Sequence, residues 1–518
     1  MLNLAILLED SAREVPERTA IVCEETRMSY AELNAATNQV AHGLAKAGIQ
    51  KGDTVALSCQ DNPSFVIAYY GILKAGAAVM PLNILLKTRE IAYHLTDGDA
   101  KAYFCQEGTP EHPIGQLGYT AFQEVVSCQH FFLMTHEPDE PDAPSSIPGA
   151  TTLSMLMRDQ PTTFEAVATS PDDTAVILYT SGTTGKPKGA ELTHLNMLLN
   201  ARLSDTMYPR ADHDVHLITL PLFHSFGQTV QMNAGIYSRA TLVLLPRFSP
   251  DAALHLMDEE NITIFAGVPT MYWAMLNYPK ADQYDLQKIA RNLRVTISGG
   301  AAMPVEVMRA FNEKFNVKIL EGYGLSETSP IAVFNRLDRE ARPGSIGFPV
   351  WGVEVRLIDA DDQDVETGEV GEIAIRGHNV MKSYYKRPDA TAEAMRHGWF
   401  HTGDIGRRDE DGYLYIVDRV KDMIIRGGFN VYPREIEEVL MTHPAVSLAA
   451  VIGVSHDRHG EEVKAFVIVK DGATITEVEL VTWSKQNMAD YKYPRLIEFR
   501  TELPMTATGK VLKSELRS

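Results

Sequence analysis

Short strand-like runs alternate with helical apolar patterns near the start of the chain, and this alternation restricts the fold more than any other feature. Tyr30 begins a pattern with apolar residues at helical spacing, and Thr54–Ser58 is a short β-type run. Residues 64–75 are helical and end at Gly76, after which residues 77–81 are strand-like. Such alternation is typical of an α/β fold in which helices cover mostly parallel sheets.

The chain is too long for one typical domain. Its 518 residues predict about two to four domains. Its 45% hydrophobic and 22% charged residues are typical of a globular protein. Lysine and arginine total 48 against 68 aspartate and glutamate residues, which gives a net charge of −20. This charge argues against a nucleic-acid partner but leaves the binding of a single nucleotide open.

Neither the cysteines nor the N-terminal residues indicate export. The cysteines form no CxxC pair, so they predict reduced, buried thiols rather than a zinc site or a disulfide framework; they are Cys23, Cys59, Cys105 and Cys128. The first ten residues lack a basic segment, and no apolar run approaches the ~20 residues that span a bilayer. We therefore expect a cytoplasmic protein with at most peripheral membrane contact.

The end of the chain differs from the rest, with a βαβ-type order and more charge. The charged turn Asp418–Asp422 precedes Gly427 and Gly428, a pair suited to a change in chain direction. This composition predicts a boundary between residues 1–419 and residues 420–518. An ordinary charged turn within one domain is the alternative.

A segment rich in glycine and hydroxyl groups follows the apolar run Val176–Tyr179. Residues 180–189 (TSGTTGKPKG) hold three glycines, four hydroxyls and two lysines. Glycine amides, hydroxyl groups and lysine ammonium groups are donors that bind phosphate oxygens. The spacing differs from the GxxxxGK[ST] loop of common NTPases, which argues against a kinase or GTPase. A surface turn is the other interpretation of such a segment.

Residues 179–189 (YTSGTTGKPKG) resemble the signature of the adenylate-forming superfamily of acyl- and aryl-CoA synthetases, firefly luciferase and peptide-synthetase adenylation domains. Further motifs follow in the family's order through essentially the whole chain, which looks most similar to bacterial fatty acyl-CoA ligases. The resemblance implies a large body of two α/β subdomains and a distorted β-barrel, followed by a small mobile α+β domain. It also implies ATP, Mg²⁺ and coenzyme A as an acceptor substrate.

The matching motifs imply a set of nucleotide-binding residues. Tyr323 offers a flat face to adenine, Asp404 can accept from both ribose hydroxyls, and Glu327 offers an oxygen to Mg²⁺. The last three residues of EGYGLSET (321–328) could instead cap a helix. The complete implied ATP set is Thr180, Ser181, Gly182, Thr183, Thr184, Lys188, Gly300, Ala301, Glu321, Gly322, Tyr323, Asp404 and Arg419.

Lys510 matches the family's catalytic lysine, at the end of PMTATGK (504–510). Its ammonium group would reduce the repulsion between the attacking carboxylate and the α-phosphate. The resemblance also implies that Thr328 lies at the α-phosphate and that His224, in PLFHSFG (221–227), lies beside the substrate carboxylate. A lone lysine or histidine is otherwise more often a solvated or structural residue.

The implied acyl pocket is apolar and open. Its residues are His224, Gly267, Val268, Met271, Ala301 and Gly324. Peptide-synthetase adenylation domains usually carry an Asp here that holds an α-amino group, and PLFHSFG contains no acid, so an amino acid is less expected than a plain carboxylic acid. The open apolar pocket favours a medium- or long-chain fatty acid, with a benzoate- or cinnamate-type aryl acid second. An apolar pocket separates neighbouring chain lengths by only ~1–3 kcal/mol, so the exact length is not predicted.

The resemblance implies two half-reactions. The acid and Mg·ATP first give an acyl-adenylate and pyrophosphate. The C-terminal unit then rotates about the hinge residue Lys421 and presents a path for the thiol of coenzyme A, formed by Gly427, Gly428, Phe429 and Asn430. A carrier-protein acceptor, a luciferase-type oxidation and a non-catalytic binder are the alternatives. Both a monomer and a homodimer fit the sequence.

Overall fold

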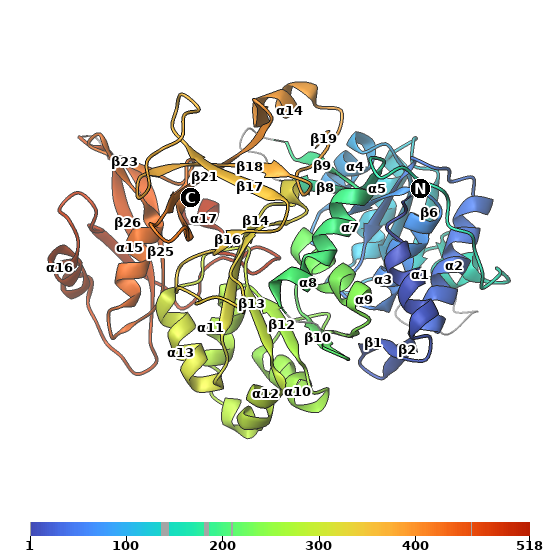
Figure 1. Cartoon of the computed structure of the whole chain (residues 1–518), viewed down its shortest axis with the longest axis horizontal. Helices are drawn as coiled ribbons and strands as arrows, with labels where there is room; N and C mark the ends of the chain where they lie inside the picture. The colour runs from blue at the N-terminus through green and yellow to red at the C-terminus, as the bar shows by residue number, and fades with distance from the viewer. Residues whose placement is uncertain (1, 136–144, 181–185, 209–210, 457, 518) are drawn as a thin grey trace.

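The computed structural model describes residues 2–517, apart from 136–144, 181–185, 209–210 and 457. Its described strands form four sheets, three in a large body and the fourth beside that body, near the end of the chain (Figure 1). The N-terminus lies on the side of the body that is remote from the fourth sheet. The expected α/β body followed by a smaller α+β unit is confirmed.

Mostly parallel strands form the sheet on the N-terminal side of the body. Its order is β19-β9-β8-β4-β3-β5-β6-β7, and of the described pairs only those that involve β9 are antiparallel. Helix α2 begins at a capping box of Ser29 and Glu32, and α3 ends before Gly76, whose φ is +79°. The strands are β3 (Thr54–Ser58), β4 (Ala78–Pro81), β5 (Ala100–Gln106), β6 (His130–Met134), β7 (Thr151–Thr152), β8 (Thr174–Thr180), β9 (Lys188–Thr193) and β19 (Ser383–Tyr384). The helices are α2 (Tyr30–Lys46), α3 (Pro63–Lys74), α4 (Thr88–Asp97), α5 (Ile114–Glu124) and α6 (Leu153–Met157).

The second sheet brings the ends of three strands to one edge. Its order is β16-β15-β14-β13-β12-β10-β11-β1-β2; Gly267 and Ser298 are the last residues of β12 and β13, and Glu321 is in register with Ser298 where the parallel pairing of β14 ends. Ligand sites of parallel sheets form at such ends. The strands are β1 (Thr19–Cys23), β2 (Thr26–Ser29), β10 (Val215–Ile218), β11 (Thr241–Leu244), β12 (Ile264–Gly267), β13 (Val295–Ser298), β14 (Ile319–Gly324), β15 (Ile331–Phe334) and β16 (Phe348–Pro349). The helices are α1 (Ile6–Glu14), α7 (His194–Arg202), α8 (Ser204–Met207), η1 (Phe226–Asn233), α9 (Ala234–Ser238), α10 (Pro250–Glu259), α11 (Pro269–Leu276), η2 (Ala281–Gln283), α12 (Leu286–Asn292), α13 (Val305–Phe315) and η3 (Ser326–Thr328).

A third, antiparallel sheet completes the body. Its path is β17-β18-β21-β20, with β22 paired to β21. Its strands are β17 (Val353–Ile358), β18 (Val370–Gly377), β20 (Met395–Arg396), β21 (Trp399–Arg408) and β22 (Leu414–Arg419), and α14 (Pro388–Ala394) precedes β20. Figure 1 shows this sheet above the second one, with β21 on the side of the body next to the C-terminal unit.

The C-terminal unit, from β23 to α17, has a hydrophobic core of its own. Ile424, Val451 and Phe466 belong to that core, and Trp273 of the body packs against it. Its strands are β23 (Ile424–Arg426), β24 (Phe429–Val431), β25 (Val446–His456), β26 (Gly460–Val469) and β27 (Leu496–Phe499). Its helices are α15 (Pro433–Met441), α16 (Glu477–Asn487) and α17 (Lys513–Leu516).

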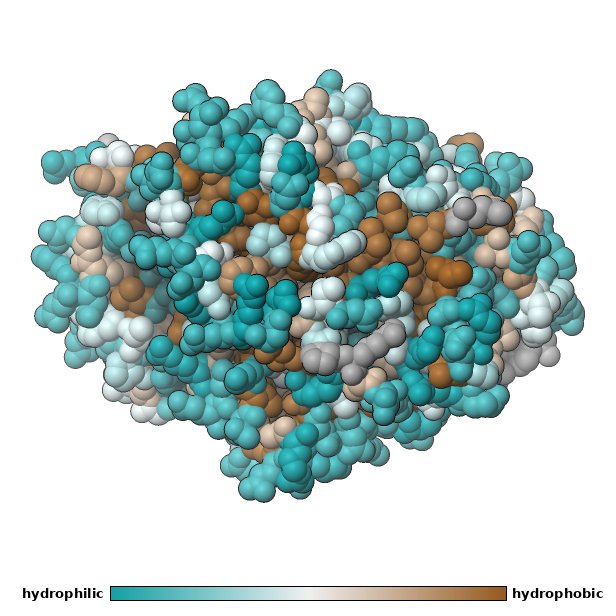
Figure 2. Space-filling view, viewed as in Figure 1, coloured by the Kyte–Doolittle hydropathy of each residue, from teal (hydrophilic) through white to brown (hydrophobic). Residues whose placement is uncertain are grey.

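Apolar residues show through the middle of the face in Figure 2, whereas hydrophilic residues cover its outer parts. All four cysteines are buried and free. Within the described residues, no helix combines the length and apolar character needed to cross a membrane.

Candidate active site

The predicted phosphate-binding segment lies between two antiparallel strands of the first sheet. β8 ends at Thr180 and β9 begins at Lys188. Ser181, Gly182, Thr183 and Thr184 lie outside the described residues. The Thr180 hydroxyl donates a hydrogen bond of 3.1 Å to Glu327 Oε1, so the segment begins beside the predicted magnesium residue.

Glu327 is buried in the short helix η3, and two hydroxyl groups bind the same oxygen of its carboxylate. Besides Thr180, the Tyr384 hydroxyl donates to Oε1 at 2.9 Å. Among the described residues, Oε2 accepts no hydrogen bond. The Lys188 ammonium lies 4.6 Å from the centre of the Tyr384 ring, which brings a cation to the same place. Tyr384 was not predicted, because it comes from β19, far away in the sequence.

Two hydroxyl residues flank Glu327, and they are placed differently. Thr328 is fully buried, and its hydroxyl donates to Pro330 O while it accepts from Leu325 N at 2.9 Å. The Thr328 hydroxyl is therefore engaged with the backbone, and its contact with the α-phosphate stays a prediction. Ser326 is partly exposed, and its Oγ lies 3.5 Å from Ser225 Oγ, next to His224. Ser326 was missed, although a hydroxyl residue directly before Glu327 could have indicated it.

Tyr323, Asp404 and Arg419 form one cluster. The Tyr323 hydroxyl donates to Asp404 Oδ2 at 2.6 Å, and Arg419 Nε lies 3.0 Å from Asp404 Oδ1. Arg419 faces Asp404 because the two residues are paired across β21 and β22. Burial, and then the Asp404 carboxylate, raise the pKa of Tyr323 well above its usual value, so the phenol stays a neutral donor.

The predicted adenine residues lie where β13 and β14 end. Gly300 and Ala301 are exposed, whereas Glu321 is buried. Glu321 Oε1 accepts a hydrogen bond of 2.9 Å from Met303 N, and among the described residues Oε2 has no partner. Burial raises the pKa of Glu321 to about 7.

Lys510 reaches this edge of the body from the C-terminal unit. Thr270 Oγ1 donates a hydrogen bond of 2.6 Å to Gly509 O, and a β-carbon placed on Gly300 would lie only 3.1 Å from Lys510 Cε. Burial, followed by the charge of Arg419, lowers the pKa of Lys510 to about 8. Trp273 Nε1 adds a second contact between the units by donating to Ser447 Oγ at 3.0 Å.

His224 lies just before η1 and is neutral. Its Nδ1 accepts a hydrogen bond of 3.2 Å from Phe226 N, which assigns the ring proton to Nε2. Burial, and then the charge of Lys510, lower the pKa of His224 to about 3. The imidazole can therefore donate a hydrogen bond through Nε2 without carrying charge.

Three of the predicted acyl residues, Gly267, Val268 and Met271, lie at the end of β12 and in the helix α11 that follows it. Val268 is buried and lies near both Gly300 and Gly509, and Met271 Sδ would lie 3.4 Å from a β-carbon on Gly267. A β-carbon on Gly324 would lie 1.7 Å from the carbonyl oxygen of Pro330, so the backbone itself requires glycine there.

The predicted coenzyme A path does not join this site in the present arrangement. Gly427, Gly428, Phe429 and Asn430 are exposed at the β23–β24 hairpin, and the Phe429 ring stacks on Tyr491 at 4.7 Å. Figure 1 shows β23 at the outer end of the C-terminal unit. Lys421 is exposed between β22 and β23.

Comparisons with known proteins agree with this geometry. The model of the AMP-binding enzyme family matches residues 8–385, and the AMP-binding enzyme C-terminal domain matches residues 435–510. A long-chain-fatty-acid–CoA ligase of Bacillus subtilis is 37% identical over 541 residues, covering 99% of this chain and 94% of the relative. A feruloyl-CoA synthase of an Amycolatopsis species is 36% identical over 509 residues, covering 98% of this chain and 96% of the relative.

A solved structure of the anthranilate CoA ligase AuaEII, in complex with anthranoyl-AMP, superposes with a TM-score of 0.90 at 31% identity. The match covers 99% of this chain and 96% of that one. The chain belongs to the AMP-binding enzyme family, which is the adenylate-forming superfamily named from its motifs. The predicted enzyme class, an AMP-forming acyl-CoA synthetase, is confirmed by these matches.

Proposed function

We propose that this protein activates a medium- or long-chain fatty acid with Mg·ATP and transfers the acyl group from the adenylate to coenzyme A. The contact of Lys510 with the ends of the body strands carries the proposal. A cation from a separate unit reaches Gly300, close to neutral His224 and the Asp404–Arg419 pair. This arrangement suits a reaction in which two anions must meet.

The nucleotide would bind across the second and third sheets. Tyr323 and the exposed Gly300 and Ala301 would enclose adenine, and Asp404 would accept from the ribose hydroxyls while Arg419 holds its other side. The glycine and hydroxyl segment after Thr180, with Lys188, would bind the phosphates. Ser326 is a better candidate than Thr328 for a phosphate hydroxyl, because the Thr328 hydroxyl already binds the backbone.

Glu327 fits a magnesium ion. Mg²⁺ favours one or two carboxylates together with substrate phosphates and water. Glu327 provides one such oxygen, and no group of three or more metal-ligating side chains occurs in the described parts of the chain. Bound Mg²⁺ would neutralise phosphate charge, while Thr180 and Tyr384 hold Glu327 Oε1 in position.

In the first half-reaction, the carboxylate oxygen attacks the α-phosphorus, and the bond to pyrophosphate breaks. Lys510 would stabilise the charge on both groups, and His224 Nε2–H would orient the carboxylate. In the second, the residues 420–518 would rotate about Lys421, and the thiol would displace AMP from the acyl carbonyl. Residues 427–430 of the β23–β24 hairpin are exposed, which supports this rotation, because these residues are not buried against the body and can move with the unit to the site.

An aryl acid is the second candidate substrate, because a feruloyl-CoA synthase is nearly as similar as the fatty-acid ligase. The test is pyrophosphate release with acids from butyrate to stearate, benzoate and cinnamates. Highest kcat/KM with aliphatic acids supports the proposal, whereas highest kcat/KM with cinnamates would replace it by the aryl alternative. A carrier protein as acceptor, a cytoplasmic location and a monomeric or dimeric state remain predictions.

A further inference from the structure

A β-bulge in β21 carries Asp404. Across the β18–β21 pair, Glu372 faces Ile405 and Ala374 faces His401, so a single residue of β18 lies opposite residues 402–404. Gly403, in the middle of these residues, has a φ of +71°. Bulges interrupt the ladder and change the direction in which a side chain points, often beside active sites. The direction of Asp404 therefore depends on what holds this bulge.

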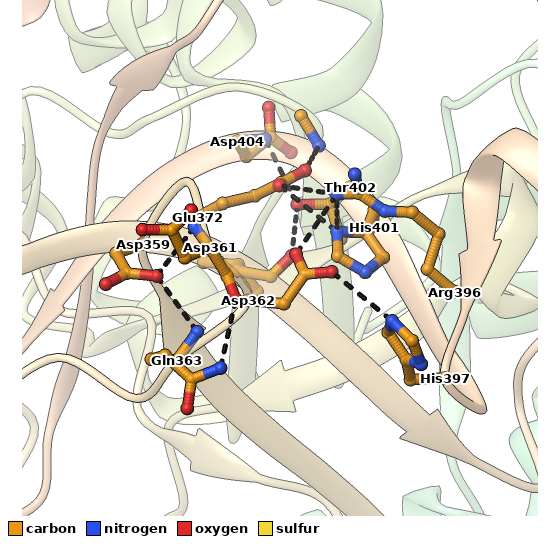
Figure 3. A network of polar contacts seen from close by, with 12 residues as sticks. Asp359, Asp361, Asp362, Gln363, Glu372, Arg396, His397, His401, Thr402 and Asp404 are labelled. Carbon is orange, nitrogen blue, oxygen red and sulfur yellow. Dashed lines mark hydrogen bonds and ion pairs between the residues drawn. The ribbon is translucent and has the colours of Figure 1, made fainter.

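Side chains supply the hydrogen bonds that the ladder lacks at the bulge. Gly403 N donates to Glu372 Oε1 at 2.9 Å. The Thr402 hydroxyl donates to Ile373 O at 2.8 Å and accepts from Asp404 N at 3.1 Å. Figure 3 shows Glu372 and Thr402 on either side of this turn, with Asp404 beyond it.

The Glu372 carboxylate is itself held from the other side. Arg396 Nη2 lies 2.5 Å from His401 Nδ1 and 3.7 Å from Glu372 Oε2, and the same His401 nitrogen lies 3.2 Å from Glu372 Oε2. Arg396 also lies 3.4 Å from Asp362 at the outer edge of the network (Figure 3). The side chain of His401 is only 7% exposed, so the Glu372 carboxylate packs against a buried ring beneath the bulge.

We propose that Glu372 is a positioning residue that fixes the bulge, so that Asp404 points at the ribose hydroxyls of ATP. This inference rests on the proposed role of Asp404. Tyr323 and Arg419 bind the Asp404 carboxylate directly, and Arg419 also pairs with Asp404 across β21 and β22. On the β18 side of the bulge, Glu372 holds the backbone through Gly403 N, because a carboxylate is a strong acceptor for a backbone N–H.

The test is ribose discrimination, measured as kcat/KM for ATP divided by kcat/KM for 3′-deoxyATP and for 2′-deoxyATP. Glu372→Ala should lower this ratio roughly tenfold, the effect of one lost charged hydrogen bond. Glu372→Gln keeps an oxygen for Gly403 N and should stay near the wild-type ratio. Glu354→Ala is the matched control, since Glu354 lies on the neighbouring strand β17 and pairs with Arg376 at the surface.

Each ratio compares two nucleotides on one enzyme preparation, so a smaller folded fraction does not change it. Should Glu372→Ala not fold, Thr402→Val tests the same bulge, and it should also lower the ratio. Equal losses for ATP and the deoxynucleotides in Glu372→Ala, or in its replacement Thr402→Val, would overturn the inference while leaving Asp404 in its role. An unchanged ratio in Asp404→Ala would instead refute the ribose role of Asp404 and the inference with it.

Discussion

Replacement of Lys510 by alanine should abolish most of the adenylation activity and leave ATP binding intact. The Lys510 side chain lies beside Gly300, and the neighbouring hydrogen bond from Thr270 to Gly509 O connects the C-terminal unit to the body. This hydrogen bond does not involve the Lys510 side chain, so the C-terminal unit of the variant should still dock on the body. Loss of one group that stabilises developing charge costs about 3–4 kcal/mol, or roughly a hundred- to a thousandfold in rate. Single-turnover release of pyrophosphate measures this rate, and titration calorimetry measures ATP binding.

The pKa of Lys510 gives the same prediction a second readout. Burial and the charge of Arg419 lower that pKa to about 8, and Asp404 offsets this only in part. About nine tenths of the ammonium groups are then protonated at pH 7, and the protonated fraction falls above pH 8. The adenylation rate should therefore fall as the pH rises through about 8, and this limb should be absent in Lys510→Ala.

Lys485→Ala provides the control, because Lys485 is an exposed lysine of α16 in the same unit. It should keep the wild-type rate and the wild-type pH profile. Full adenylation by Lys510→Ala, or an unchanged pH limb in that variant, would refute the role given to the ammonium group.

Three further predictions concern contacts around the site. Thr270→Val removes the hydrogen bond to Gly509 O, so pyrophosphate release should slow about tenfold. Thioester formation from supplied acyl-adenylate should stay unchanged, and equal slowing of both reactions would contradict this prediction. Tyr384→Phe removes a donor to Glu327 Oε1, so the Mg²⁺ concentration for half-maximal activity should rise roughly tenfold; an unchanged magnesium titration would exclude this role. Burial raises the pKa of Glu321 from 4.5 to about 7, so the folded form keeps a proton that the unfolded chain loses, and stability should fall as pH rises across this window. Glu321→Gln should flatten that part of the curve of melting temperature against pH, and a curve parallel to wild type would disprove the cause.

The sequence predicts local elements well where a residue type requires one backbone conformation. The end of α3 was expected at Gly76, which has a positive φ, and the short strand at residues 54–58 is β3. The motifs also indicated the superfamily, because each segment, such as the one that holds Asp404 or the one that holds Lys510, is a short continuous stretch of the chain. These features depend on short-range sequence alone.

Contacts between distant segments were not predicted. Tyr384 reaches Glu327 only because the edge strand β19 pairs with β9, a partner almost 200 residues earlier. The different directions of Ser326 and Thr328 depend on how η3 packs against residues 330 and 225, which the motif does not specify. The role proposed for Glu372 depends on a register shift between two strands, and no local pattern in β18 indicates it.

The central claim is that one site first makes an acyl-adenylate and then transfers the acyl group to coenzyme A. The most direct test supplies the purified protein with Mg·ATP, coenzyme A and its best acid, and measures AMP and acyl-CoA together by mass spectrometry. The account predicts that AMP and the thioester appear in equal amounts. Pyrophosphate and acyl-adenylate without any thioester would contradict it, and a carrier protein would then become the leading acceptor.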